Sequence, residues 1–290
     1  MRYEGAIFRP PSEAGSLLIQ ATIGCPHNRC TFCGLYKKKK FRIRPVAEIK
    51  EDLWMARDTY GNGIRTIFFP DGNSIVLKTA ELIEIFEFAQ QLFPHLERIT
   101  IYGSARFLLR KSLDDLKALR QAGLGRIHSG MESGDDEVLR RIQKGATADQ
   151  IIEAGCRVKE AGIELSEYLL IGIGGRELSQ QHALGSARVL NAIDPDFIRV
   201  RTYTPVPKTP LGQEYLAGSF QLPSPHEAIK ELRLILENLK TTGLFLSDHI
   251  SNYANINGKL PEDKEKMLQI LDYALTIDES KFPSQDYRYM

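Results

Sequence analysis

Short apolar runs rich in β-branched residues alternate along the chain with longer segments whose apolar residues recur at helical spacing. In the segment 79–92, for example, Leu82, Ile85, Phe86 and Ala89 form a single stripe. Other helix patterns fall at 46–60 and 179–192. The alternation predicts six strands, at 16–23, 66–69, 98–102, 126–131, 164–171 and 196–203.

Six strand–helix units with short connections predict an α/β fold, in which helices cover a parallel sheet. Right-handed crossovers can curl such a sheet into a (β/α)6 partial TIM barrel, which is the architecture we predict. An open doubly wound sheet gives nearly the same pattern and is the alternative. Two later helix patterns, at about 225–242 and 261–276, predict a C-terminal helical extension. We therefore expect a core domain at 1–205 and an extension at 206–290 that caps the barrel.

Charge and composition narrow the class of protein. The chain carries 38 basic and 37 acidic side chains, a formal net charge of +1, so it has no global field that would attract nucleic acid or a membrane surface. No stretch approaches the roughly 20 apolar residues that span a bilayer, and the first residues lack the layout of a signal peptide. We expect a cytoplasmic protein without a membrane partner.

Three of the four cysteines, Cys25, Cys30 and Cys33, lie within nine residues directly after the first predicted strand. Such clustering in a chain that is not exported predicts a metal site rather than disulfides. Three thiolates can hold a [4Fe–4S] cluster with one iron left open, whereas His27 could complete a four-ligand zinc site. The position of the loop at the end of a strand favours the cluster. Cys156, on an amphipathic helix pattern, is expected to be buried and inert.

The cysteine loop resembles the signature of the radical S-adenosylmethionine (SAM) superfamily, in which an aromatic residue precedes the third cysteine. Phe32 is at that position, although the spacing here is C-x4-C-x2-C and the usual first gap is three residues. The resemblance covers about residues 15–205 and extends to the core of methylthiotransferases and oxygen-independent coproporphyrinogen oxidases. It implies an oxygen-sensitive iron–sulfur enzyme that holds a [4Fe–4S] cluster on the three cysteines and cleaves SAM reductively. The 5′-deoxyadenosyl radical so formed would abstract hydrogen from a substrate.

The same resemblance implies SAM-binding residues at further strand ends. Asp71, Gly72 and Asn73 stand where the family binds the methionine ammonium, although Pro-Asp-Gly by itself is simply a turn signal. Glu132 and Lys144 match the positions that meet the SAM ribose and carboxylate. The alternative for Lys144 is a solvated helix end.

The fifth predicted strand ends in a glycine-rich segment that resembles the family's segment near the adenine. Gly172 begins it, and Tyr168 lies on the same strand face and is expected either at the cofactor or in the core. The glycine spacing does not match a dinucleotide fingerprint. Ser133, just after the fourth strand, is expected to be a helix N-cap.

Candidates for substrate chemistry lie later in the chain. Arg199 and Arg201 alternate on the sixth strand and so share a face, where they could bind a substrate carboxylate or phosphate or pair with buried acids such as Asp196 or Glu167. After a short apolar run, three polar side chains in close succession could bind substrate or move a proton. These are His249, Asn252 and Tyr253.

The partners we expect are a small or medium organic substrate and a reducing protein such as flavodoxin or ferredoxin. The run Lys37–Lys40 could contact an RNA backbone, but a solvated loop is the favoured interpretation and nucleic acid is not expected. Two alternatives to a radical enzyme acting on a small substrate stay open: a non-catalytic iron–sulfur protein for electron transfer or cluster delivery, and an RNA-modifying enzyme.

Overall fold

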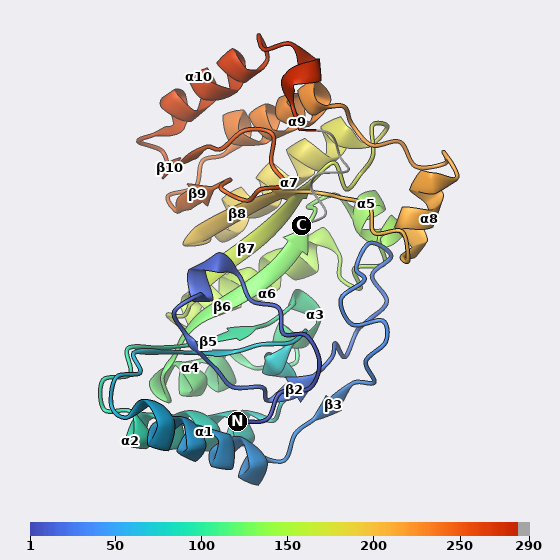
Figure 1. The fold of residues 1–290 in the computed structure, drawn as a ribbon. Coiled ribbons are helices and arrows are strands. Elements are labelled where there is room, and N and C mark those ends of the chain that lie inside the picture. Colours follow the sequence, from blue (N-terminus) through green and yellow to red (C-terminus); the bar gives the residue numbers. More distant parts are fainter. Residues whose placement is uncertain (284–290) are drawn as a thin grey trace. The chain divides into compact units, whose positions relative to one another are not determined.

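The structure, a computed structural model, describes residues 1–283, which form two compact units (Figure 1). The units interleave along the sequence, because strand β6 (Leu124–Glu132) begins in one and ends in the other. Unit 1 comprises Met1–Asn28, Leu35–Ser129 and Arg157–Leu165. Unit 2 comprises Arg29–Gly34, Gly130–Cys156 and the residues from Ser166 onward.

Unit 1 contains the first parallel strands, in the order β1-β4-β5-β6. Helix α2 buries Leu82, Ile85, Phe86 and Ala89, the stripe predicted from the sequence. Helix α2 packs against α1 and α4. The bounds are β1 (Leu17–Leu18), β4 (Thr66–Phe69), β5 (Arg98–Tyr102), α1 (Val46–Tyr60), α2 (Thr79–Leu92), α3 (Ala105–Leu108) and α4 (Leu113–Gln121).

The prediction of one strand over 16–23 is wrong. The run divides into β1, which pairs in parallel with β4, and β2 (Thr22–Ile23), which pairs antiparallel with β3 (Arg42–Ile43). The run is mostly apolar because both pieces and the residues between them are largely buried. Apolarity therefore did not reveal that the chain changes hydrogen-bonding partners.

Unit 2 continues the strand order from the end of β6 through β7, β8, β9 and β10. β7, β8 and β9 run parallel, and β10 is antiparallel to β9. Helices α7 and α9 pack on each other, and α10 packs on α9 (Figure 1). The bounds are β7 (Glu164–Ile171), β8 (Phe197–Thr202), β9 (Leu244–Leu246), β10 (Asn257–Lys259), α5 (Asp136–Arg141), α6 (Ala148–Glu160), α7 (Ser179–Ile193), α8 (Pro210–Leu216), α9 (Pro225–Asn238) and α10 (Lys264–Ala274).

The predicted α/β class is confirmed by this mostly parallel arrangement of eight strands with intervening helices. The strand order has two ends, β1 and β10, so the described residues form no closed barrel. The segment after residue 205 is not purely helical, because β9 and β10 extend the sheet beyond β8. Helix α9 stops at Asn238 rather than near 242, since the chain must turn there for Leu244 to pair with Phe197. No helix in the described part of the chain has the length and apolar content needed to cross a membrane.

Candidate active site

At several strand ends the backbone adopts the left-handed region of φ and ψ angles. The φ angles are +78° at Gly24, +70° at Asp71, +64° at Glu132 and +78° at Gly172. Glycine adopts this conformation freely, but in other residues it is uncommon and accumulates at functional sites. Asp71 and Glu132, both predicted to bind SAM, are therefore held in a conformation that local propensity disfavours.

In unit 1, Cys25 lies directly against the loop that follows β4. A Cβ atom on Gly72 would be 2.5 Å from Cys25 Cβ and 2.9 Å from Cys25 Sγ, so no larger residue fits there without displacement. The backbone N–H of Asn28 donates to Cys25 Sγ at 3.5 Å, and Asn73 Nδ2 lies 3.9 Å from it. Amide donors directed at a thiolate sulfur are typical of iron–sulfur ligation. The surroundings of Cys25 fit a cluster ligand.

Asp71 is a wholly buried residue that ties this loop to the strand preceding Cys25. Its Oδ2 accepts hydrogen bonds from the Gly24 N–H and from Gln20 Nε2, both at 2.9 Å, and the Gly72 N–H donates back to Gly24 O. Burial raises the pKa of Asp71, against the lowering effect of these donors and of Lys39, 3.9 Å away. Its carboxylate faces protein rather than solvent, which gives Asp71 a positioning role.

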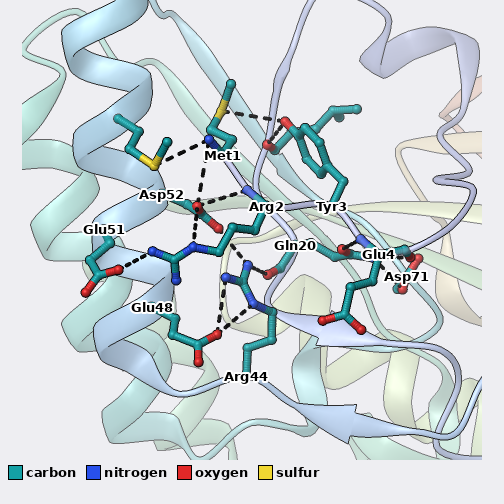
Figure 2. A network of polar contacts seen from close by, with 12 residues as sticks. Met1, Arg2, Tyr3, Glu4, Gln20, Arg44, Glu48, Glu51, Asp52 and Asp71 are labelled. Atoms are coloured by element: carbon teal, nitrogen blue, oxygen red, sulfur yellow. Dashed lines mark hydrogen bonds and ion pairs between the residues drawn. The ribbon is translucent and has the colours of Figure 1, made fainter.

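The same polar network extends outward from Asp71 (Figure 2). Gln20 Oε1 accepts from the Glu4 N–H, while Arg44 donates to Gln20 O and to Asp52, both at 2.7 Å. Lys39 Nζ donates to Glu4 O. Lys39, in the run Lys37–Lys40 considered for RNA binding, thus has an intramolecular partner.

In unit 2, the loop 29–34 carries Cys30, Phe32 and Cys33. The Thr31 N–H donates to Ile142 O at the end of α5, and the Leu211 N–H of α8 donates to Thr31 O, both at 3.0 Å. These bonds hold the loop between two helices of its own unit. Phe32 and both cysteines are partly exposed.

Glu132 and Lys144 form an ion pair at 2.9 Å, with side chains 13% and 11% exposed. Burial acts to lower the pKa of Lys144, but the charges of Glu132 and Cys30 and the hydrogen bond to Glu132 outweigh it and raise the pKa. Lys144 is therefore a near-buried cation close to a predicted cluster ligand, and the solvated-helix-end alternative is wrong. The structure thus brings together three residues predicted to act at the cofactors, Cys30, Glu132 and Lys144.

Ser133 is not a helix N-cap, because that role belongs to Asp135, whose side chain accepts from the Val138 N–H. Ser133 Oγ lies 2.8 Å from His182 Nδ1 and accepts the Asp135 N–H. The Gly134 N–H donates to Ser186 Oγ. Ser133 thus joins the end of β6 to α7.

His182 leads to a buried carboxylate that the sequence analysis missed. Glu231 is 2% exposed, accepts the Gly172 N–H at 2.7 Å and the Ser179 hydroxyl, and lies 3.5 Å from His182 Nε2. Burial raises the pKa of Glu231 to about 7 and lowers that of His182 to about 4. The signal in the sequence was an acidic residue on the apolar stripe of α9, between Ala228 and Ile235.

Arg199 and Arg201 share the face of β8 opposite buried Ile198 and Val200, as predicted. Arg199 Nε is buried and has no hydrogen-bond partner among residues 1–283. Both predicted roles of the pair, substrate binding and pairing with buried acids, stay predictions. Arg201 Cζ lies 5.5 Å from the Tyr168 ring centroid. Tyr168 therefore meets the arginine pair rather than the apolar core.

The polar residues after β9 have different surroundings. His249 is half-buried, and its Nδ1 accepts the Ser251 N–H at 3.1 Å. Asn252 donates to Val200 O and Ser247 Oγ, which fastens this loop to the end of β8. Tyr253 makes an edge contact with Phe282. The structure thus gives Asn252 a positioning role, and the charge of Arg201 acts on the His249 ring.

Two cysteine predictions have different outcomes. Cys156 is exposed, not buried, and its Sγ lies 3.5 Å from Ala192 O.

Cys25 belongs to unit 1 and Cys30 and Cys33 to unit 2, and within residues 1–283 no three His, Cys, Asp or Glu side chains are grouped as a metal site. The three-cysteine ligand set stays a prediction from the sequence.

Comparison with known proteins agrees with this arrangement. A model of the radical SAM superfamily matches residues 19–184, more than half of the chain. An uncharacterized methyltransferase of Pyrococcus horikoshii is 26% identical over 71% of the chain and 43% of its own length. The heme chaperone HemW of Bacillus subtilis is 22% identical over 79% of the chain and 61% of its own length. The chain thus spans about half the length of these two relatives.

Solved structures show the same fold. Coproporphyrinogen III oxidase (HemN) from Escherichia coli superposes with a TM-score of 0.58 at 20% identity, over 77% of this chain and 51% of that one. Methylornithine synthase (PylB) superposes with a TM-score of 0.56 at 20% identity, over 88% of this chain and 68% of that one. The chain belongs to the radical SAM superfamily. The family match supports the [4Fe–4S] cluster and SAM that the cysteine loop predicted.

Proposed function

We propose that this protein binds a [4Fe–4S] cluster through Cys25, Cys30 and Cys33 and uses it to generate a radical that abstracts hydrogen from a small or medium organic substrate. The observation that carries the proposal is the near-buried Glu132–Lys144 pair beside Cys30. When bound and reduced, the cluster supplies the electron that splits SAM into methionine and the 5′-deoxyadenosyl radical.

The chain's own residues would bind and orient SAM. Lys144 supplies a cation for the SAM carboxylate, and Glu132 can accept both ribose hydroxyls. The carbonyls of Asp71, Gly72 and Asn73 would receive the ammonium group, while the buried Asp71 side chain holds that segment against Gly24. We place Phe32 at the cluster and Gly172 near the adenine. A reducing protein of the flavodoxin or ferredoxin kind would deliver the electron.

The test is anaerobic reconstitution with iron and sulfide, followed by dithionite reduction in the presence of SAM. We expect methionine and 5′-deoxyadenosine. A cluster that forms and leaves SAM intact would contradict the proposal and favour an electron-transfer or cluster-delivery protein. The ligand set is tested by Cys30→Ala, which should lose the visible absorbance and iron of the cluster, with Cys156→Ala as the matched control that keeps both.

A further inference from the structure

The arginine pair on β8 places two positive charges on one side of a single strand. Arg199 and Arg201 are two residues apart on one strand and point to the same side of it. In the described part of the chain, Arg199 Nε is buried and has no hydrogen-bond partner. Unpaired guanidinium groups held side by side repel each other and lose hydration, and a bound anion relieves both effects.

Aromatic rings hold both guanidinium groups in place. Arg201 Cζ lies 5.5 Å from the centroid of Tyr168, and Arg199 Cζ lies 5.7 Å from that of Phe197. Contact between a guanidinium and a ring orients the guanidinium plane and leaves its N–H edges available. The pair is therefore organised before any ligand arrives.

His249 adds a third donor near this pair. Because the Ser251 N–H donates to His249 Nδ1, that nitrogen is unprotonated and the neutral imidazole carries its proton on Nε2. The loop is fixed to the end of β8, where the Thr202 N–H donates to Ser251 Oγ at 3.1 Å and Asn252 donates to Val200 O at 2.8 Å. Burial and, after it, the charge of Arg201 lower the pKa of His249 and so disfavour a second proton on the ring, against the opposing effect of the exposed Asp248.

We propose that Arg199, Arg201 and His249 form an oxyanion-binding subsite that recognises a carboxylate or phosphate group of the substrate. This inference rests on the proposed function, since it names the class of molecule on which that enzyme acts. The subsite uses other residues than the Glu132–Lys144 pair, to which the proposed function assigns the SAM carboxylate. The substrate is an organic anion.

The probes are succinate and inorganic phosphate, each titrated calorimetrically into the reconstituted holoenzyme saturated with SAM. We expect wild-type protein to bind at least one of them, and the preferred probe distinguishes a carboxylate from a phosphate substrate. Arg199→Gln and Arg201→Gln should each weaken that binding by about tenfold or more. Arg201→Lys, which retains charge but loses the planar fork, should fall between wild type and Arg201→Gln.

The matched control is Arg188→Gln, an exposed arginine of the same unit that pairs with Asp149 and should leave probe binding unchanged. Circular dichroism checks that each variant is folded. The proposal is wrong if wild-type protein binds neither probe or if both glutamine variants bind as wild type does. It is also wrong if the variants lose affinity for SAM itself by the same factor, because the arginines would then hold the SAM carboxylate. Failure of SAM cleavage by wild-type protein would overturn only the proposed function, because these titrations involve no turnover.

Discussion

At the residue scale, Gly72 can lie directly against Cys25 because glycine has no Cβ atom. Gly72 approaches Cys25 so closely that a methyl group would overlap its Cα, Cβ and Sγ atoms. The φ angle of Gly72 is not in the left-handed region, so close approach, rather than conformational freedom, requires the glycine. The glycine therefore defines where the thiolate lies.

We predict that Gly72→Ala moves Cys25 and prevents full cluster assembly, with a destabilisation of about 1–3 kcal/mol from overpacking. Iron and sulfide content after anaerobic reconstitution measures the first effect, and urea unfolding the second. Gly15→Ala is the control, since no atom lies within 4 Å of its added Cβ. A Gly72→Ala protein with a complete cluster would show that Cys25 is not a ligand held by this contact.

A second residue-scale prediction concerns the Glu132–Lys144 pair. Lys144→Met removes a cation and leaves Glu132 near-buried without its partner, so SAM affinity should fall by about tenfold or more. Glu132→Gln should also weaken SAM binding, and the double variant should lose less than the sum of the two. Equilibrium binding of SAM to reconstituted protein provides the measurement, with exposed Lys266→Gln as control. Additive losses would indicate that the two side chains act independently.

At the element scale, Glu231 connects α9 to the end of β7 and the start of α7. It accepts from the Gly172 N–H and from Ser179, and it lies beside His182. A carboxylate in this position fixes the glycine-rich segment that we expect near the adenine. Its protonation therefore links pH to the stability of these elements.

Glu231 has its pKa raised to about 7 by burial, so its proton is bound more tightly in the folded protein than in the unfolded chain. The stability that the protonated group contributes is complete below its ordinary pKa of 4.5 and is lost as pH rises through about 7. His182, with a pKa lowered to about 4, acts oppositely and contributes stability that is lost as pH falls from 6.5 through 4.

We predict that wild-type protein loses roughly 2–3 kcal/mol of unfolding free energy relative to Glu231→Gln between about pH 5 and about pH 8. Both proteins retain His182, so its contribution cancels in the difference. Urea unfolding at several pH values measures the difference in unfolding free energy between the two proteins. Glu237→Gln, which changes an exposed carboxylate near the C-terminal end of α9, should show no such trend. A pH-independent difference for Glu231→Gln would mean that the burial of Glu231 does not perturb its protonation.

At the scale of the whole molecule, the segment after residue 205 is built into the fold rather than appended to it. β9 pairs in parallel with β8, and Phe245 of β9 is fully buried. Helix α9 packs on α7 and supplies Glu231. The division into 1–205 and 206–290 stays a prediction about domains, but the contacts of unit 2 cross that boundary.

We therefore predict that a chain ending at Pro205 is less stable than the full chain and does not bind SAM measurably. The truncation exposes the edge of β8 and removes the acceptor of the Gly172 N–H. Far-UV circular dichroism, urea unfolding and SAM titration compare the two chains. If residues 1–205 bind SAM with the affinity of the full chain, the extension is a separable cap.

Local sequence patterns determined the α/β class and the positions of most helices and strands, and they predicted the superfamily from the cysteine loop. They succeeded because helical and strand periodicities reflect burial of one face of an element against its neighbours. Clustered thiolates are also an unusual and specific composition. The shared face of Arg199 and Arg201 followed in the same way from the alternation of side chains along a strand.

Only the tertiary structure decided which polar groups face one another. The contacts of the buried Glu231 and the contact between Ser133 and His182 join residues that are distant in sequence. Periodicity predicts that a residue lies on an apolar face. Whether a charged group on that face is buried, and which groups it then contacts, depends on how the helices pack. The division of 16–23 between two strand pairings was likewise invisible, because hydrogen-bonding partners of a buried run are chosen by the rest of the fold.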